Sequence, residues 1–439
     1  MLRLVPLAIL GSVLLAAGEA RPAALTVSIT SISARSNSAA VSFGASGPVR
    51  TYIEYGQDNQ YGLWTKTTAP QSSGRILLGA LEPNRTYQFR LVASSGTELV
   101  YGAGSFRTRP MRLTSVATTT GNALFVDTQA LFPRMVFQTC AYYYDSALAA
   151  GINVFMGNAC TPTAQLDLLA GRAYSVVALT NRGLRGRGLI GWFQHDEPDG
   201  FGLTSLPLPP SSRATGRVTF LTLTDHFSSR AAPLPVGKAV YPKLISRANV
   251  IGFDTYPLQT RCSGDFTYVY DMQKELVGLA AGKPTFQWIE SGPMGKCPGH
   301  DPTPATIRAE TWLAIAGGAR GIGYFPDFWP GDIGKTIGAV DEEIAALAPA
   351  LLAPSYPVSF GPDGTPVKAG ARTLNGAVYV IAANPSYGPA TTTFTVPGLR
   401  ASAVTVYGEG RMLPVVKGRF TDSFAGLGVH VYVAAPSGS

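Results

Sequence analysis

Two glutamates, Glu197 and Glu290, carry the clearest chemical signal in this sequence. Glu197 lies in the segment 191–200, GWFQHDEPDG, where apolar residues run directly into ionisable ones. Glu290 lies near the end of a second apolar segment, 284–292, PTFQWIESG. A carboxylate beside buried apolar residues is costly unless it is used or solvated. Carboxyl groups that flank one bond are what glycosidic cleavage requires, because one donates a proton and the other attacks or stabilises the anomeric carbon.

The sequence around these glutamates has the pattern of repeated βα units. Between residues 111 and 355, apolar strand-like runs alternate with helical segments, which predicts a (β/α)8 TIM barrel. The runs lie at 134–140, 152–158, 174–180, 189–199, 217–227, 249–258, 284–292 and 321–330. The helix after the third run is poorly defined. A doubly wound sheet is the alternative, but no glycine-rich phosphate loop follows the first strand.

In such a barrel both glutamates lie at the C-terminal mouth, where barrel enzymes place their catalytic residues. Glu197 ends the fourth run and Glu290 the seventh, so they can flank one substrate from opposite sides. The alternatives are a cap or loop charge for Glu197 and a buried ion-pair partner for Glu290, although no basic residue adjoins Glu290.

Polar and aromatic side chains near the ends of the runs are predicted to bind the substrate. These candidates are Asn158, Asp196, Asp225, His226, Asp254, Tyr256, Trp288 and Trp329. Turn capping is the alternative for Asp196 and Asp254, and a solvated loop is the alternative for Asp225 and His226. Trp192 lies inside a run and is predicted to belong to the core. No His/Asp cluster has metal-ligand spacing, so neither a catalytic metal nor a cofactor is expected.

The strand-four motif Asp196-Glu197-Pro198 and the strand-seven glutamate resemble the retaining glycoside hydrolases of the (β/α)8 superfamily. That superfamily carries its acid/base on strand four, usually as Asn-Glu or Asn-Glu-Pro, and its nucleophile on strand seven. The resemblance implies that Glu197 is the acid/base and Glu290 the nucleophile, with Tyr256 beside the nucleophile. The chain departs from the pattern at Asp196, which replaces the usual Asn. It also lacks the strand-two Arg, where Asn158 is nearest.

Short strands with period-two alternation are predicted on both sides of the barrel. Residues 21–110 form a β-sandwich whose segment 81–93 resembles the tyrosine corner of fibronectin type III domains, with Tyr87 as its tyrosine. Residues 356–439 form a second β-sandwich with no obvious catalytic constellation. The predicted organisation is therefore a leader at 1–20, a fibronectin III-like unit at 21–110, the barrel at 111–355 and a C-terminal unit at 356–439.

Residues 1–20 have a basic start, an apolar run and small residues at the end, as in a secretory signal peptide. Their apolar run is short for a membrane span, so we expect a secreted, extracellular or periplasmic protein. The cysteines fit that compartment. Three pairings are possible, and we predict Cys140–Cys160 and Cys262–Cys297 because each pair follows neighbouring strands. A zinc site is the alternative, but no Cys-x-x-Cys pair is present.

The function predicted from these features is a secreted retaining glycoside hydrolase that acts on a polysaccharide or cell-wall glycan. The net charge of +8 is scattered without a long basic run, and no motif suggests a nucleic-acid partner. The rival from another class is a non-catalytic glycan-binding barrel, which would need no carboxylate pair. An inverting glycosidase is a further alternative, and the distance between the two carboxyl groups separates it from a retaining one.

Overall fold

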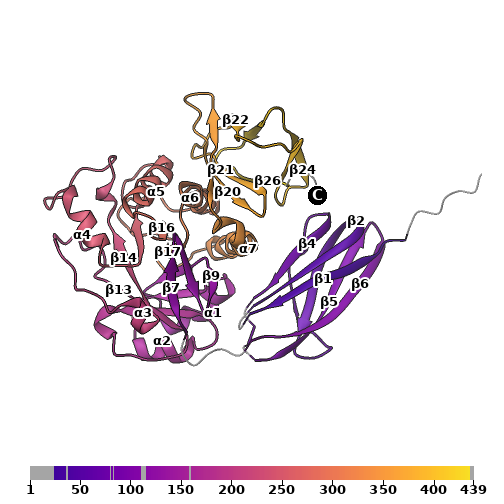
Figure 1. Ribbon diagram of the computed structural model, residues 1–439, viewed down its shortest axis with the longest axis horizontal. Helices are drawn as coiled ribbons and strands as arrows, with labels where there is room; N and C mark the ends of the chain where they lie inside the picture. The colour runs from indigo at the N-terminus through magenta and orange to yellow at the C-terminus, as the bar shows by residue number, and fades with distance from the viewer. Residues whose placement is uncertain are drawn as a thin grey trace, which may run out of the picture.

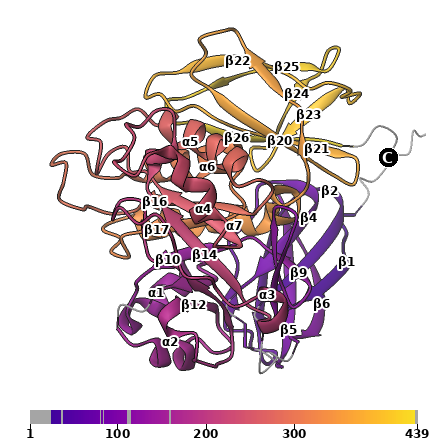
Figure 2. The ribbon, with the colours of Figure 1, turned by 60° about the vertical axis from the view of Figure 1, so that its left-hand side comes forward.

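The computed structural model of the protein describes residues 24–35, 38–79, 81–82, 84–109, 115–157 and 160–435. The predicted leader 1–20 and Asn158 lie outside these residues. A closed barrel of parallel strands is preceded in the chain by an N-terminal unit and followed by a C-terminal unit, both built of antiparallel strands (Figures 1 and 2). The predicted fold class, a TIM barrel with flanking β units, is therefore confirmed.

Each barrel strand lies within one of the predicted runs. The strands are β10 (Arg134–Phe137), β11 (Val154–Met156), β12 (Tyr174–Ala178), β13 (Leu189–Phe193), β14 (Val218–Leu223), β15 (Val250–Asp254), β16 (Thr285–Glu290) and β17 (Ile322–Phe325). Every strand pairs in parallel with the next, and β17 closes the ring on β10 through Arg134 opposite Ile322. Since all strands point the same way, their carboxyl ends form one mouth.

The helical layer is uneven around the barrel. Short helices are α1 (Tyr144–Ala149), α2 (Pro162–Leu168), α3 (Ser212–Thr215) and α4 (Tyr241–Ile245), and long ones are α5 (Thr267–Leu279), α6 (Pro304–Gly317) and α7 (Ile333–Leu351). After β12 only the 3-10 turn Leu179–Asn181 is present, in agreement with the weak helical pattern there. Helix α6 begins at a capping box in which the Thr303 side chain accepts from the Thr306 N–H.

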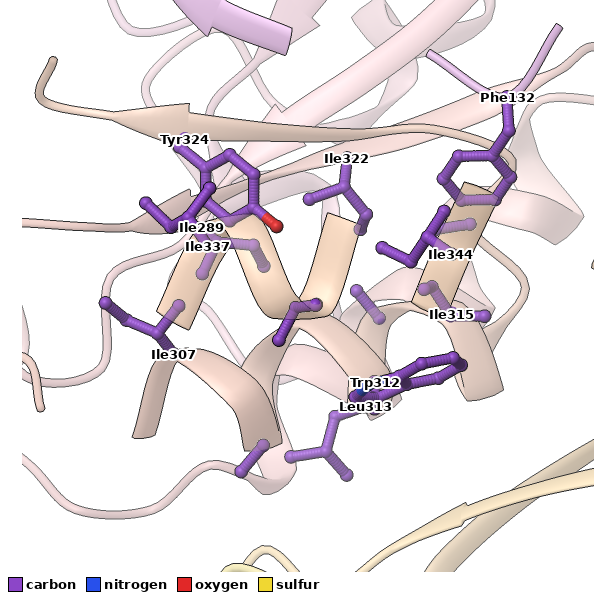
Figure 3. Close-up of a cluster of buried hydrophobic side chains, with 14 of the residues drawn as sticks. Phe132, Ile289, Ile307, Trp312, Leu313, Ile315, Ile322, Tyr324, Ile337 and Ile344 are labelled. Carbon is purple, nitrogen blue, oxygen red and sulfur yellow. The ribbon is translucent and has the colours of Figure 1, made fainter. Parts of the chain in front are cut away.

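Alternation along β16 builds two cores. Phe286 and Trp288 point into the barrel, whereas Ile289 joins the buried cluster that α6 and α7 cover. Figure 3 shows Ile289 and Tyr324 of the strands gathered with Ile337 of α7 in that outer cluster. Full burial of one such side chain contributes about 1.5–3 kcal/mol, so the long helices hold this half of the barrel firmly.

A small antiparallel sheet covers the end of the barrel opposite the mouth. It consists of β7 (Ala117–Thr120), β8 (Ala123–Val126) and β9 (Gln129–Leu131). Leu124 and Val126 share the interior cluster with Val218 and Val250, which begin their barrel strands. Access to the barrel centre is therefore restricted to the mouth.

The N-terminal unit is organised by one long strand, β2. The strands are β1 (Val27–Ala34), β2 (Ala39–Gly56), β3 (Leu63–Trp64), β4 (Gln71–Leu78), β5 (Thr86–Ser95) and β6 (Glu98–Arg107). The first half of β2 pairs with β1 and β4, and its second half pairs with β3 and β5. The Tyr87 hydroxyl accepts a hydrogen bond from the Glu82 N–H at 2.9 Å, a local bond at the place where the tyrosine corner is predicted.

The C-terminal unit packs directly on α6. Its strands are β18 (Ser355–Tyr356), β19 (Ser359–Gly361), β20 (Lys368–Leu374), β21 (Ala377–Ala383), β22 (Ala390–Thr395), β23 (Ala403–Val406), β24 (Arg411–Pro414), β25 (Arg419–Phe424) and β26 (Val429–Ala434). They form a six-stranded sheet and the three-stranded sheet β19-β22-β25. Gly370 lies so close to α6 that a Cβ there would meet the Ala316 carbonyl oxygen at 2.2 Å. Ile381 and Val431 share the outer barrel cluster.

The structure contains both predicted disulfides. Cys140 is bonded to Cys160 with a Cα–Cα distance of 5.5 Å, and Cys262 to Cys297 with one of 5.2 Å. Each bond joins the loops that follow two neighbouring barrel strands. In the part of the chain that the structure describes, no helix has the length and apolar character needed to cross a bilayer.

Candidate active site

A cavity of about 590 Å³ opens at the carboxyl ends of the barrel strands. Seven of the predicted site residues line it: Asp196, Glu197, Asp225, His226, Asp254, Tyr256 and Trp288. The remaining wall is formed by Phe137, Thr222, Thr224, Thr255, Thr260, Pro293, Met294, Lys296, Phe325 and Pro326. The structure therefore brings most of the predicted substrate-binding residues and one of the two predicted catalytic glutamates into one pocket.

Glu197 has an unusual backbone conformation. Its φ angle is 46°, in the left-handed region, and its N–H donates to the Thr222 carbonyl oxygen of β14 at 3.2 Å. The left-handed conformation costs a residue with a side chain roughly 1–2 kcal/mol. Such strain persists only where the surrounding structure enforces it, and it is concentrated at functional sites. The turn thereby directs a carboxyl group into the pocket from the end of β13.

The Glu197 carboxyl shares a hydrogen bond with Asp254 at the end of β15. Burial, this hydrogen bond and the negative charges of Glu197, Asp196 and Asp225 raise the pKa of Asp254 well above its ordinary value. Two carboxyl groups in contact cannot both ionise readily, so Asp254 tends to retain its proton beside Glu197.

Asp196 adds a third carboxyl group to the same wall. Burial, followed by the charge of Glu197, raises its pKa to about 6, and His195 opposes the shift. Asp196 therefore changes its charge at a pH well above that of an ordinary aspartate.

Asp225 differs from these carboxyls because a cation neutralises it. Its Oδ2 accepts from the Thr255 hydroxyl at 2.8 Å and is ion-paired with the Arg261 guanidinium. The His226 Nδ1 lies 2.7 Å from the Ala232 carbonyl oxygen, so that nitrogen is directed away from a ligand. These contacts order the rim of the pocket at the ends of β14 and β15.

Asp199 was not among the predicted site residues, yet it fixes the loop that carries Glu197. It is 1% exposed and accepts from the Thr224 N–H and the Tyr241 hydroxyl, both at 3.1 Å, and also from the Thr224 hydroxyl. Its position two residues after Glu197 in the DEPD motif was the available signal. Since Thr224 lines the pocket, Asp199 ties the β13 loop to the β14 loop.

Aromatic side chains form the apolar part of the wall. The Trp288 indole N–H donates to the Thr222 hydroxyl at 3.1 Å, and its ring lies 5.4 Å from that of Phe137. Tyr256 packs near Phe325, with ring centroids 6.2 Å apart. These bonds fix the orientation of a surface that can contact the apolar face of a ligand.

Two further predicted aromatic positions lie elsewhere. Trp329 is not among the residues that line the pocket; its indole N–H donates to the Pro326 carbonyl oxygen at 3.1 Å and its ring packs near Tyr324. Trp192 is 2% exposed in the core, as predicted.

Glu290 does not line the pocket either, although it ends β16 as predicted. It is fully buried, and its two carboxyl oxygens accept from the Leu258 and Gln259 N–H groups at 2.8 Å each. On its other side it contacts Glu310 of α6. Backbone donors of the loop after β15 bind the Glu290 carboxyl, and the residues that line the pocket include Glu197 and Asp254 but not Glu290, so the pairing of Glu197 with Glu290 across one substrate stays a prediction. The carboxyl that meets Glu197 belongs to Asp254.

Within the described ranges, no group of three or more His, Cys, Asp or Glu side chains is arranged to hold a metal ion. The chemistry that the pocket residues themselves offer is proton transfer and attack by carboxyl groups.

No protein-family model matches the sequence, and no curated protein matches it. Solved structures similar to this chain include the GH30 endoxylanase of Clostridium papyrosolvens C71, with 12% identity, a TM-score of 0.42 and coverage of 73% of this chain and 99% of that one. The family 30 subfamily 8 xylanase Xyn30A of Clostridium acetobutylicum has 13% identity and a TM-score of 0.39, with 74% and 97% covered. Alpha-galactosidase I of Mortierella vinacea has 11% identity and a TM-score of 0.44, with 67% and 91% covered. All three are glycoside hydrolases, and the barrel of this chain is defined by its own strand pairing.

Proposed function

We propose that this protein is a glycoside hydrolase that works outside the cytoplasm and cleaves its substrate in the pocket at the barrel mouth. The observation that carries the proposal is the pair of carboxyl groups, Glu197 and Asp254, that share a hydrogen bond in the pocket wall. Glycosidic cleavage needs one protonated and one ionised carboxyl beside the same bond, and a pair that holds a single proton provides both. The two disulfides support an oxidising compartment.

The roles follow from where the proton resides. The raised pKa of Asp254 makes it the general acid, which protonates the glycosidic oxygen as the bond to the anomeric carbon breaks. Glu197 is then the ionised carboxylate that attacks the anomeric carbon. In the second step Asp254, now ionised, takes a proton from water, and that water releases the sugar from Glu197. This assignment reverses the role predicted for Glu197 and replaces Glu290 by Asp254.

The closeness of the pair favours retention of configuration. Inverting enzymes separate their carboxyl groups by about 6.5–9.5 Å to admit a water molecule, whereas retaining enzymes need about 5–5.5 Å. Carboxyl groups in hydrogen-bond contact are nearer to the second value. Attack by Glu197 itself, with a covalent glycosyl-enzyme, is therefore the proposed course.

The lining of the pocket favours a neutral or amino sugar. The carboxyl groups of Asp196, Glu197 and Asp254 line it without an ion-paired cation from the described chain, whereas Asp225 is neutralised by Arg261. Its basic lining residues are the exposed Lys296 and the half-buried His226. An anionic sugar would meet repulsion from these carboxyls without a guanidinium to bind it. Trp288 and Tyr256 offer ring surface for the apolar face of a sugar.

A screen of the purified protein on aryl glycosides and cell-wall polysaccharides tests this proposal, with Asp254→Asn as the inactive comparison. The exposed Asp363→Asn is a matched control for the loss of one carboxyl. We expect turnover by the wild type and by Asp363→Asn and its loss in Asp254→Asn. Binding of a polysaccharide without any turnover would instead support the non-catalytic glycan-binding barrel.

A further inference from the structure

Glu290 is bonded in a way that suggests a role in shaping the pocket. Its two oxygens accept from consecutive backbone N–H groups, those of Leu258 and Gln259, at 2.8 Å each. Tyr256 and Thr260, on either side of these residues in the chain, line the pocket. A buried carboxylate that accepts two backbone N–H bonds fixes the path of the segment that donates them. Residues 256–260 are called the pocket wall segment below.

The same segment holds the neighbouring loop. The Gln259 side chain accepts from the Met294 N–H and donates to the His300 carbonyl oxygen at 2.8 Å. Met294 lines the pocket, and the bond between Cys262 and Cys297 joins the two loops again a few residues further on. A movement of the Glu290 carboxyl would therefore displace pocket-lining residues in the loops after both β15 and β16.

Glu310 of α6 completes the arrangement. Glu290 and Glu310 are both fully buried and their carboxyl groups interact, and among the described residues the Glu310 oxygens have no donor other than a proton shared with Glu290. No Lys, Arg or His of the described chain is ion-paired with either. The other titratable groups on which the charges of this pair act are the hydroxyls of Tyr256 and Tyr387; both have raised pKa values and carry no charge while protonated. Two buried carboxyls in contact without a cation retain one proton between them.

We propose that Glu290 and Glu310 form a proton-sharing clamp that positions the pocket wall segment and that loosens when the shared proton is lost to solvent. While the proton is present, Glu310 donates it to Glu290, and the Glu290 oxygens remain acceptors for the two N–H groups. Once it is lost, two like charges face each other in a buried site and push the Glu290 carboxyl away from its place. Glu290 is thus a positioning residue.

Its burial supports a transition at accessible pH. The pKa of Glu290 is raised to about 7 by burial, against the opposing effect of the Leu258 and Gln259 hydrogen bonds, and that of Glu310 is raised well above its ordinary value. Raised carboxyl pKa values favour the protonated folded state, so Glu310 keeps the shared proton at low pH and the clamp is lost only as pH rises through the raised pKa of Glu310. The clamp stands without the proposed function, on which only its effect on substrate binding depends.

Two isosteric variants separate the shared proton from the clamp itself. In Glu310→Gln the amide N–H donates to Glu290 at every pH, and the Glu290 oxygens keep both backbone donors. In Glu290→Gln the side-chain amide turns an N–H toward a backbone N–H, so one of the two bonds is lost at every pH. The two variants remove the same number of titratable groups and have opposite expected effects.

Hydrogen exchange of peptides covering 256–260, measured by mass spectrometry at about pH 6 and about pH 9 and corrected for intrinsic rates, tests the clamp. We expect wild-type protection to fall roughly 10- to 100-fold at the higher pH, Glu310→Gln to stay protected at both, and Glu290→Gln to be poorly protected at both. For a substrate that the protein hydrolyses, KM should rise wherever the protection of this segment falls, while kcat changes less.

Equal protection of the wild type at both pH values, together with wild-type protection in Glu290→Gln, would overturn the proposal. If Glu290→Gln does not fold, the comparison of wild type with Glu310→Gln decides alone: a pH-dependent loss in both variants overturns the shared proton as its cause. Since exchange needs no substrate, absence of glycosidase activity refutes the proposed function and leaves the test of the clamp intact.

Discussion

The carboxyl groups of Glu197 and Asp254 meet although their strands, β13 and β15, are separated in the barrel by β14. The contact is reached because Glu197 follows β13 in a left-handed turn whose N–H is bonded to the Thr222 carbonyl oxygen of β14. Asp254, by contrast, is the last residue of its strand. The turn after β13 therefore places the Glu197 carboxyl across the end of β14. Without this backbone conformation Glu197 would not reach Asp254.

The first prediction concerns the roles of this pair. Asp254→Ala should lose about 10²–10⁴ in rate on natural glycans, whose leaving groups need a proton. On an aryl glycoside with an acidic phenol it should lose much less in the first step. Glu197→Ala should be nearly inactive on both, because no leaving group replaces a nucleophile. Steady-state and burst kinetics on the two substrate types measure the difference.

Added azide provides the control for these roles. In Asp254→Ala it should attack the glycosyl-enzyme and give a product of retained configuration. In Glu197→Ala it should occupy the vacated space and give the inverted product. Interchanged stereochemistry would return Glu197 to the acid/base role predicted from the sequence.

The second prediction concerns pH and Asp196. Because burial raises its pKa to about 6, the folded state favours protonated Asp196, and stability is lost as pH rises from about 4 toward 6. Asp196→Asn removes this loss, so its stability relative to wild type should increase over that interval. The gain should stay below about 3 kcal/mol, since the carboxyl is partly solvated. Urea unfolding at several pH values measures it, and a difference independent of pH would contradict the shift.

The third prediction concerns the loop support at Asp199. Asp199→Asn leaves the size unchanged but turns an N–H toward a donor, either of Thr224 or of Tyr241. We expect a loss of about 2–4 kcal/mol in the free energy of unfolding, together with reduced kcat/KM. Guanidinium unfolding measures the loss. The exposed Asp363→Asn should change the free energy of unfolding by less than about 0.5 kcal/mol. Equal changes in the two variants would show that the Asp199 hydrogen bonds do not support the loop.

The fourth prediction concerns the disulfides. Cys262–Cys297 spans 35 residues and Cys140–Cys160 spans 20. In the chain-entropy account their removal by paired Cys→Ser changes costs about 4 and about 3 kcal/mol, respectively. Loss of the first should also raise KM, because Met294 and Thr260 of the joined loops line the pocket. Thermal unfolding of the two double variants measures the losses of stability, and their kinetics measure KM. An unchanged KM without the Cys262–Cys297 bond would show that this bond does not shape the pocket.

The fifth prediction concerns the charge of the substrate. An aryl glycoside that is hydrolysed should lose most of its kcat/KM when its sugar is replaced by the corresponding uronide, since the pocket wall has an excess of carboxyl groups. Higher salt should lessen the difference because it screens the repulsion. Preferential turnover of the uronide would contradict the proposed substrate class.

The sequence was sufficient to locate the barrel strands, the cysteine pairs and Glu197, because hydrophobic runs and the DEP motif are local signals. It does not tell which groups bind the Glu290 carboxyl. Period-two alternation tells which strand residues face the barrel interior, but at the last residue of β16 the N–H groups of Leu258 and Gln259, thirty-two and thirty-one positions away respectively, determine where the carboxyl lies. That loop conformation is not encoded near Glu290.

Asp254 and Trp329 illustrate the same difficulty. The sequence leaves Asp254 open between substrate contact and capping, since nothing near it in the sequence indicates that Glu197 lies beside it. Trp329 follows its strand closely enough to reach the mouth, yet its indole is held by the Pro326 carbonyl oxygen. In both cases the outcome depends on a hydrogen bond made by a loop.

The packing of the C-terminal sheet on α6 bears on how this protein can be engineered. Gly370 lies against the Ala316 carbonyl, the Arg372 guanidinium donates to the Ile315 carbonyl oxygen at 3.2 Å, and the Tyr270 hydroxyl of α5 donates to the Ala369 carbonyl oxygen at 2.8 Å. A recombinant barrel cut at residue 355 would expose the apolar side chains of the outer barrel cluster that Ile381 and Val431 cover, and it should precipitate during purification. A chimeric protein would thus have to contain the barrel and its C-terminal sheet together.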